Sequence, residues 1–266
     1  MLFRSGLVIR SQLEMPEFAS LSGHVAARPD LTFSFGVLSL PSSPPDAPAR
    51  TIEPTPHGAL LCWNRIGAFL VEHGHSVTID PVDGVDERLL RLVLTGPVLG
   101  VALAQRGHHV FHGSVVVPPG GDAALGVLAR KGEGKSTLAA ALYNAGYSMM
   151  SDDLLVVGPR SGGRPVVLPG FPHAKLWADA ADALVAGADA LPRLAPEFDK
   201  RARSITDRFR DTPAELGRLF VLERGDQVAA TPLTGFSAAR ALLPHWYGAL
   251  FDGQLMPVLG TDRHFR

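Results

Sequence analysis

The segment Ala129–Thr137 (ARKGEGKST) has the residue types and order of a phosphate-binding loop. A short apolar run at Ala124–Leu128 precedes it, and a helical run at Lys135–Ala145 follows. This setting of strand, loop and helix is the one that such a loop requires. Glycines let backbone N–H groups face phosphate oxygens, and the start of the helix adds the positive end of its dipole. The segment therefore predicts binding of a nucleoside triphosphate, ATP, together with Mg²⁺.

Each position of the loop has an expected task. We expect Lys135 to reach the outer phosphates and the Ser136 hydroxyl to ligate magnesium. The consensus begins with glycine, whereas this chain has Ala129, which fits only if its φ stays negative. The residues that we expect to bind the nucleotide are Gly132, Glu133, Gly134, Lys135, Ser136 and Thr137. The competing interpretation is an incidental Gly-x-Gly-Lys-Ser string in front of an ordinary helix.

An acidic pair, Asp152-Asp153, follows the loop at a distance that fits one helix and one returning strand. Two adjacent acids between apolar strand segments are costly unless a cation or a proton donor compensates them. One carboxylate can accept the proton of an attacking hydroxyl, and the other can serve magnesium. His112, on the strand before the loop, is a further candidate. The alternatives are a solvated turn for the acids and a structural role for the histidine.

Two domains are expected, residues 1–88 and 89–266. The first is a small β-rich domain, with strands at Leu7–Ile9, Leu31–Leu40 and within Ala59–His73, and a loop at Pro41–Pro48. The second opens with a helix over Arg88–Gln105, and its class is α/β with a mixed sheet and flanking helices. Its further expected elements are strands His109–Val117, Tyr147–Met150, Leu154–Val157 and Val166–Leu168, a helical stretch from Pro172 to Asp189, a mobile loop over Leu191–Ile205, a hairpin of Leu219–Leu222 with Val228–Thr231, and a helix Phe236–Leu243.

The overall composition argues against several functional classes. The formal net charge is −1 and the pI is about 6.8, so the basic excess of a nucleic-acid binder is missing. No apolar run approaches the ~18 residues of a membrane span, and the first residues lack the apolar core of a signal peptide. The single cysteine, Cys62, fits a reducing compartment. We therefore expect a cytoplasmic protein with no nucleic-acid or membrane partner.

Between Val110 and Val157 the chain resembles the catalytic core of HPr kinase/phosphorylase. The resemblance rests on His112-Gly113, on Gly132-Glu133-Gly134-Lys135-Ser136 with the helix that ends at Gly146, and on Asp152-Asp153. It implies a P-loop kinase domain of the HPr kinase and phosphoenolpyruvate carboxykinase type, with ATP and Mg²⁺ as cofactors. It also implies that Asp152 is the general base, that Asp153 serves the metal together with Ser136, and that His112 assists near the γ-phosphate with Lys135.

Two features differ from the usual pattern of that family. Thr137 stands where the family usually has glutamate, and the downstream Glu-Ile-Arg-Gly segment is replaced by the stretch Leu168–Trp177. This stretch, with the β-rich N-terminal part, is similar to divergent members that phosphorylate the C-terminal serine of lasso-peptide precursors. The resemblance thus implies an ATP-dependent serine kinase whose partner is a peptide or protein with an acceptor serine.

A cation is also needed to neutralise the transferring phosphoryl group. The candidates downstream of the acidic pair are Lys175, Lys200, Arg201, Arg203 and Arg208. Two other functions stay open: an ATP-binding sensor without transfer, and a small-molecule kinase. A sensor does not need a base beside a metal ligand, and no cluster of substrate-directed arginines is visible in the sequence. A homo-oligomer is left open as well.

Overall fold

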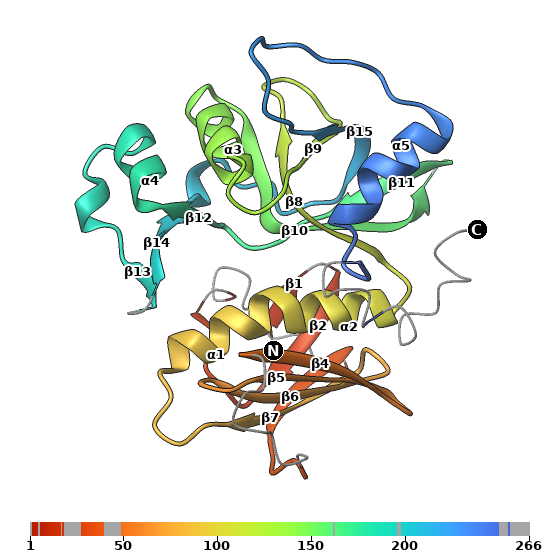
Figure 1. Ribbon diagram of the computed structural model, residues 1–266, viewed down its shortest axis with the longest axis vertical. Helices are drawn as coiled ribbons and strands as arrows, with labels where there is room; N and C mark the ends of the chain where they lie inside the picture. Colours follow the sequence, from red (N-terminus) through yellow and green to blue (C-terminus); the bar gives the residue numbers. More distant parts are fainter. Residues whose placement is uncertain are drawn as a thin grey trace. The chain divides into compact units, whose positions relative to one another are not determined.

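The computed structural model describes residues 2–4, 6–16, 18, 28–39, 49–161, 163–195, 198–249 and 255. It is a mixed α/β structure with several sheets, and it divides into two compact units, one built on Met1–His108 and the other on His109–Leu250 (Figure 1). We expected the division at residue 88. The helical segment before His108 groups with the first unit instead, where the Gln105 side chain bonds the backbone of Gly74 and Val71. The loop expected at Pro41–Pro48 lies outside the described residues.

The first unit contains a seven-stranded sheet of order β1-β2-β3-β7-β6-β5-β4. The strands are β1 (Leu2–Arg4), β2 (Leu7–Ser11), β3 (Leu31–Phe35), β4 (Arg50–Thr55), β5 (Gly58–Trp63), β6 (Gly67–Glu72) and β7 (Ser76–Pro81). β3 is parallel to both neighbours, and the other pairs are antiparallel. One helical segment follows the sheet, made of α1 (Glu87–Val93), the π-helical turn η2 (Leu94–Val98) and α2 (Leu99–Gln105). Apolar side chains such as Phe33, Phe69 and Leu99 are fully buried in this unit.

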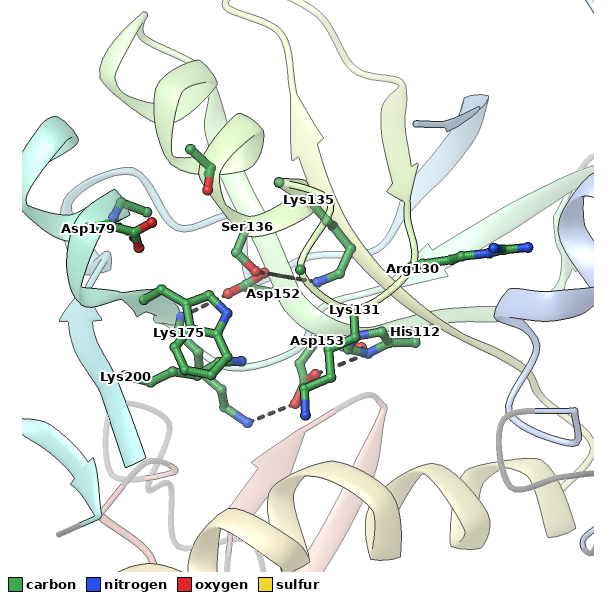
Figure 2. A pocket seen from close by; sticks show the side chains of 15 residues that line it. His112, Arg130, Lys131, Lys135, Ser136, Asp152, Asp153, Lys175, Asp179 and Lys200 are labelled. Atoms are coloured by element: carbon green, nitrogen blue, oxygen red, sulfur yellow. Dashed lines mark hydrogen bonds and ion pairs between the residues drawn. The ribbon is translucent and has the colours of Figure 1, made fainter. Parts of the chain in front are cut away.

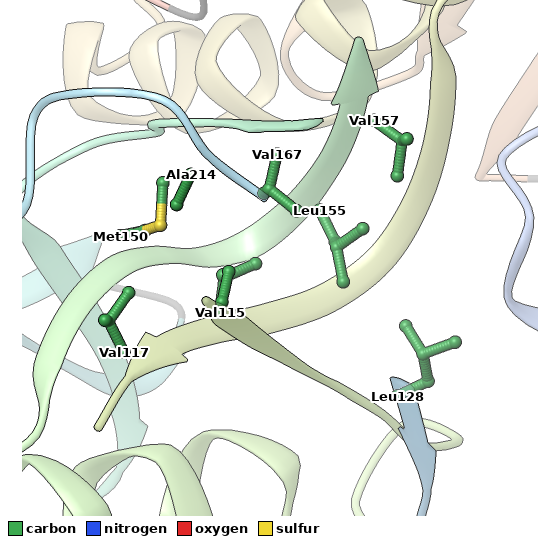
Figure 3. Close-up of a cluster of buried hydrophobic side chains, with 9 residues drawn as sticks. Val115, Val117, Leu128, Met150, Leu155, Val157, Val167 and Ala214 are labelled. Atoms are coloured by element: carbon green, nitrogen blue, oxygen red, sulfur yellow. The ribbon is translucent and has the colours of Figure 1, made fainter. Parts of the chain in front are cut away.

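The second unit is built on a closed barrel of order β10-β11-β15-β9-β8. Its strands are β8 (His109–Val117), β9 (Ala124–Leu128), β10 (Ser148–Ser161), β11 (Arg164–Leu168) and β15 (Ala214–Val221). β9 and β15 run parallel, whereas the other described pairs are antiparallel. Figure 3 shows the core, where Val115, Leu128, Leu155 and Val167 pack from four strands. Helix α3 (Lys135–Asn144) packs against the barrel through Ala139 and Tyr143.

A small three-stranded sheet of order β12-β14-β13 lies beside α3 (Figure 1). Its strands are β12 (His173–Trp177), β13 (Arg193–Ala195) and β14 (Phe198–Ser204). The helix expected from Pro172 to Asp189 was therefore wrong in its first part: α4 spans only Ala178–Leu184, and the 3₁₀ turn η3 follows at Ala188–Ala190. The expectation of a mobile loop over Leu191–Ile205 was wrong too, because Lys200–Ser204 of β14 pair with the whole of β12. In both segments, the pairing of β12 with β14 outweighed the helix or loop preference of the local sequence.

The C-terminal part of the unit contains η4 (Thr206–Arg208), α5 (Gly235–Leu242) and η5 (Leu243–His245). The hairpin expected from Leu219–Leu222 and Val228–Thr231 does not form. Instead Leu219 and Val221 belong to β15, which pairs with β9, and residues 228–231 are not in a strand. The segment expected to pair with Val228–Thr231 in an antiparallel hairpin thus pairs with the distant strand β9 in parallel.

Candidate functional site

The phosphate-loop segment connects the end of β9 to the start of α3. Gly132 and Gly134 both adopt a left-handed φ of 87°, a conformation that glycine tolerates without strain. Gly134 is the N-cap of α3, and no side chain caps the free N–H groups there. Ala129 is buried and keeps a negative φ, as an alanine in place of the consensus glycine must. The first turn of α3 can therefore offer its N–H groups to an anion.

Asp152 and the side chains of Ser114, Ser136 and Lys135 form a connected polar cluster. Asp152 Oδ1 accepts hydrogen bonds from Ser114 Oγ at 2.6 Å and Ser136 Oγ at 3.0 Å, and lies 3.6 Å from Lys135 Nζ. Asp152 Oδ2 accepts from the backbone N–H of Lys175 at 2.8 Å. The Asp152 side chain is 1% exposed. Both of its oxygens are thus occupied, and it binds directly to the loop serine.

Burial alone would raise the pKa of the Asp152 carboxyl. The Lys135 ammonium and the hydrogen bonds from Ser114 and the Lys175 backbone oppose this effect, and the net result is a pKa below the ordinary value. Asp152 is therefore an anion at neutral pH, held next to a hydroxyl and an ammonium.

Asp153 faces a different set of partners. Its Oδ2 lies 2.8 Å from Lys175 Nζ, and its Oδ1 lies 3.1 Å from His112 Nδ1. Its side chain is 26% exposed, so one face of the carboxylate remains accessible. The residue has a φ of 113°, which is a strained conformation for a residue with a Cβ. Such strain is commonly found at functional sites, where the surrounding structure holds it.

The environment of Asp153 also favours its anionic form. Burial acts to raise the pKa of this carboxyl, but the Lys175 charge, followed by the hydrogen bond and charge of His112, lowers the pKa well below its ordinary value. Asp153 is therefore an anion at neutral pH, like its neighbour Asp152.

Strand pairing explains why the two acids lie together with His112. Both acids lie inside the single strand β10, whereas we expected them between two strands. In the antiparallel pair of β10 and β8, Asp152 lies opposite Ser114, and Asp153 lies opposite Gly113. A Cβ at Gly113 would lie 2.6 Å from Leu128 Cδ2 and 3.1 Å from Val127 O, so β9 leaves little room for a side chain there. The register shifts between Met149 and Ser151, which adds to the local irregularity.

A cavity of about 130 Å³ opens over these groups. Figure 2 shows Lys175 and His112 reaching Asp153 from opposite sides, while Asp152 points toward Ser136. Of the residues expected to bind the nucleotide, the cavity wall includes Gly132, Gly134, Lys135, Ser136 and Thr137. Glu133 instead accepts a hydrogen bond from the Arg130 backbone at 3.2 Å within the loop. In the described ranges, no group of three or more His, Cys, Asp or Glu residues is arranged to hold a metal by itself.

Of the five basic residues considered for neutralising a phosphoryl group, two line the cavity and three lie elsewhere. Lys175 and Lys200 line the cavity, and Lys200 Nζ lies 4.9 Å from the centre of the Trp177 ring. Arg201 bonds the Leu191 carbonyl, and Arg203 bonds Asn144 and stacks on Tyr143. Arg208 bonds the Tyr143 carbonyl and covers the same ring. The three arginines therefore stabilise the sheet and α3 rather than line the cavity.

Several residues of the site escaped the sequence analysis. Ser114 bonds Asp152, and its place two residues after His112 in the same strand was the available signal. Lys131, Trp177 and Asp179 also line the cavity. No local pattern marks Trp177 or Asp179, because β12 reaches the loop only through tertiary packing.

The part of the chain that the structure describes contains no helix with the length and apolarity needed to cross a bilayer. No protein-family model matches the chain, and no curated protein sequence matches it. Among solved structures, the HPr(Ser) kinase/phosphatase from Coxiella burnetii is similar, with a TM-score of 0.29 and 14% sequence identity. The match covers 48% of this chain and 73% of that one.

Proposed function

We propose that this protein is an ATP-dependent kinase that transfers the γ-phosphate to a serine hydroxyl of a peptide or protein. The observation that carries the proposal is the division of the acidic pair: Asp152 binds the loop serine, whereas Asp153 faces the cavity between two groups that hold it as an anion. A nucleotide site alone needs only the first acid. The second acid supplies what a transfer to a hydroxyl requires.

Ser136 and Asp152 would hold magnesium. Both offer oxygen atoms, which this cation prefers, and Ser136 Oγ lies 3.0 Å from Asp152 Oδ1. A magnesium ion held there would supply positive charge against the phosphate oxygens of the nucleotide. Magnesium sites beside phosphates commonly use only one or two carboxylates, so a larger acidic cluster is not required.

Asp153 is the general base in this proposal. We expected Asp152 in that role and Asp153 on the metal side, but the contacts favour the reverse assignment. A base must touch the acceptor hydroxyl. Both acids have partners on both oxygens, but the Asp152 side chain is 1% exposed, whereas the Asp153 side chain is 26% exposed at the cavity. Asp153 would accept the proton as the acceptor oxygen bonds the γ-phosphorus and ADP leaves. His112 and Lys175 keep the carboxylate oriented.

Lysines supply the charge that the transferring group requires. Lys135 lies in the loop, and Lys175 lies at the cavity with its ammonium on Asp153. When Asp153 accepts a proton, it loses its negative charge and its ion pair with Lys175 weakens. The Lys175 ammonium can then interact with the phosphoryl oxygens. Burial chiefly lowers the pKa of Lys200, against the raising effect of Asp153 and Asp152, so Lys200 is the weaker candidate.

The resemblance to divergent kinases suggests a C-terminal serine of a lasso-peptide precursor as the acceptor. The test is incubation of serine-terminated peptides with the protein, ATP and magnesium, followed by mass spectrometry. We expect the gain of one phosphoryl group on the peptide. Failure of every peptide to gain a phosphoryl group, with ATP binding intact in calorimetry, would favour the sensor or a small-molecule acceptor instead.

Variants of the acidic pair test the assignment of roles. We expect Asp153→Asn to slow transfer by ~10²–10⁴-fold, the usual contribution of a general base, with ATP affinity retained. Asp182→Asn, an exposed carboxylate on α4 outside the cavity, is the matched control and should transfer at the normal rate. Near-normal transfer by Asp153→Asn would show that the base lies elsewhere.

A further inference from the structure

The cavity over the acidic pair is too small for a complete nucleotide. Its volume is about 130 Å³, whereas sites for cofactors and drug-sized ligands usually measure ~300–1,000 Å³. It can hold a terminal phosphate and an acceptor hydroxyl. The base and ribose must therefore lie against another part of the surface that is continuous with the phosphate loop.

A second cavity adjoins the same loop on its other side. Its volume is about 750 Å³, and it lies between the loop, the end of β15 and helix α5. Arg130 lines both cavities. Figure 2 shows the Arg130 side chain pointing away from Asp152 and Asp153, toward the blue C-terminal segment. The loop is thus the shared wall between the small cavity and the large one.

The strand arrangement gives an independent reason for a ligand at this place. β9 and β15 are parallel neighbours in register, with Leu128 opposite Val221, and Leu222 N donates to Leu128 O at 2.8 Å. The phosphate loop leaves the carboxyl end of β9, and the wall of the large cavity leaves the carboxyl end of β15. Because two parallel neighbours have their carboxyl ends at the same edge, a ligand held by the loop can extend to the wall of the large cavity.

We propose that the cavity between the phosphate loop, the end of β15 and α5 binds the base and ribose of the nucleoside triphosphate. This inference rests on the proposed function. The walls suit such a ligand: Leu222 and Ala241 offer apolar surface to a flat base, and the guanidinium groups of Arg224 and Arg240 can stack on it. The Glu223 carboxylate can accept hydrogen bonds from ribose hydroxyls.

The far wall is tied to the loop. His245 is 5% exposed, lines the large cavity and bonds the backbone of Ala129, the first residue of the loop. The next residue, Trp246, forms a bridge with Phe111 of β8, and Tyr247 N donates to Val110 O at 2.8 Å. The His245 part of the cavity wall is therefore anchored to the phosphate loop and, through the next two residues, to β8.

Calorimetry with two probes separates the base subsite from the phosphate subsite. The probes are a non-hydrolysable ATP analogue and inorganic tripolyphosphate, both with magnesium. We expect Ala241→Phe, which fills the cavity, to weaken the analogue by roughly tenfold or more and to leave tripolyphosphate unchanged. Ala239→Phe is the matched control, because Ala239 is exposed on the same helix and does not line the cavity. Equal binding of the analogue by both variants would overturn the inference and leave the proposed function standing.

Photolabelling tests the same inference without a variant. The wild-type protein is irradiated with 8-azido-ATP and magnesium, digested and mapped by mass spectrometry. Label within Val221–His245 supports the inference, and label on Trp177 or α4 overturns it. If the wild-type protein binds neither tripolyphosphate nor the analogue, both this inference and the proposed nucleotide site are overturned.

Discussion

Lys175 contacts both members of the acidic pair, although it belongs to a different sheet. Its Nζ lies 2.8 Å from Asp153 Oδ2, and its backbone N–H donates to Asp152 Oδ2 at 2.8 Å. One residue of β12 thus fixes two consecutive residues of the barrel strand β10. The small three-stranded sheet therefore orients the carboxylates as well as covering α3.

Replacing Lys175 should change the pH dependence of transfer. The Lys175 charge is the largest of the effects that lower the pKa of Asp153, so Lys175→Met should raise that pKa. A base with a lowered pKa stays ionised as the pH falls, and a raised pKa moves the loss of activity to higher pH. We expect the acid limb of the kcat profile to shift upward in Lys175→Met, together with a lower plateau.

A control variant accompanies the Lys175 measurement. Arg201→Met removes a cation from the adjacent strand, and because its guanidinium bonds Leu191, the acid limb should not move. An unchanged acid limb in Lys175→Met would argue against control of Asp153 by this lysine.

Asp152→Asn should act on magnesium rather than on proton transfer. The amide keeps the shape but loses the charge that a hard cation requires. We expect the magnesium concentration for half-maximal ATP binding to rise roughly tenfold or more, with part of the lost activity restored by excess magnesium. Titration of ATP binding against magnesium measures this. Loss of transfer with a normal magnesium dependence would instead restore Asp152 as the base.

Ser114→Ala should destabilise the protein. Ser114 is fully buried and donates at 2.6 Å to a carboxylate that is itself 1% exposed. Loss of a buried hydrogen bond to a charged group costs about 1.5–3 kcal/mol of the free energy of unfolding. Urea denaturation checks this, with Ser237→Ala as the control, because Ser237 makes an exposed hydrogen bond to Thr234 O. A loss no larger than that of the control would contradict the prediction.

Gly113→Ala should destabilise the protein, because β9 lies close to the Cα of Gly113 and leaves little room for a methyl group. The added Cβ would lie 2.6 Å from Leu128 Cδ2 and 3.1 Å from Val127 O, and overpacking of this kind costs about 1–3 kcal/mol of unfolding free energy. Gly158→Ala in the neighbouring strand is the matched control, since its nearest contact is 3.4 Å from the Leu168 side chain. Thermal unfolding of the two variants provides the comparison. Equal melting temperatures would show that β9 moves aside at little cost.

The sequence alone determined the elements whose signals are local. β8 and β9 have the expected bounds, α3 starts at the expected Lys135, and Gly146 follows it with a left-handed φ. Local backbone preference and apolar runs were sufficient there, because the bounds of each element follow from its own residue types.

Only the tertiary structure decided how the acids differ and which cation accompanies them. Asp152 and Asp153 are adjacent in sequence and chemically identical, so no pattern could assign one to Ser136 and the other to His112 and Lys175. The choice of Lys175 over Arg201 follows from the pairing of β12 with β14 and from the contact of β12 with β10. Contacts between strands distant in the sequence depend on the packing of the whole unit, which local preference does not encode.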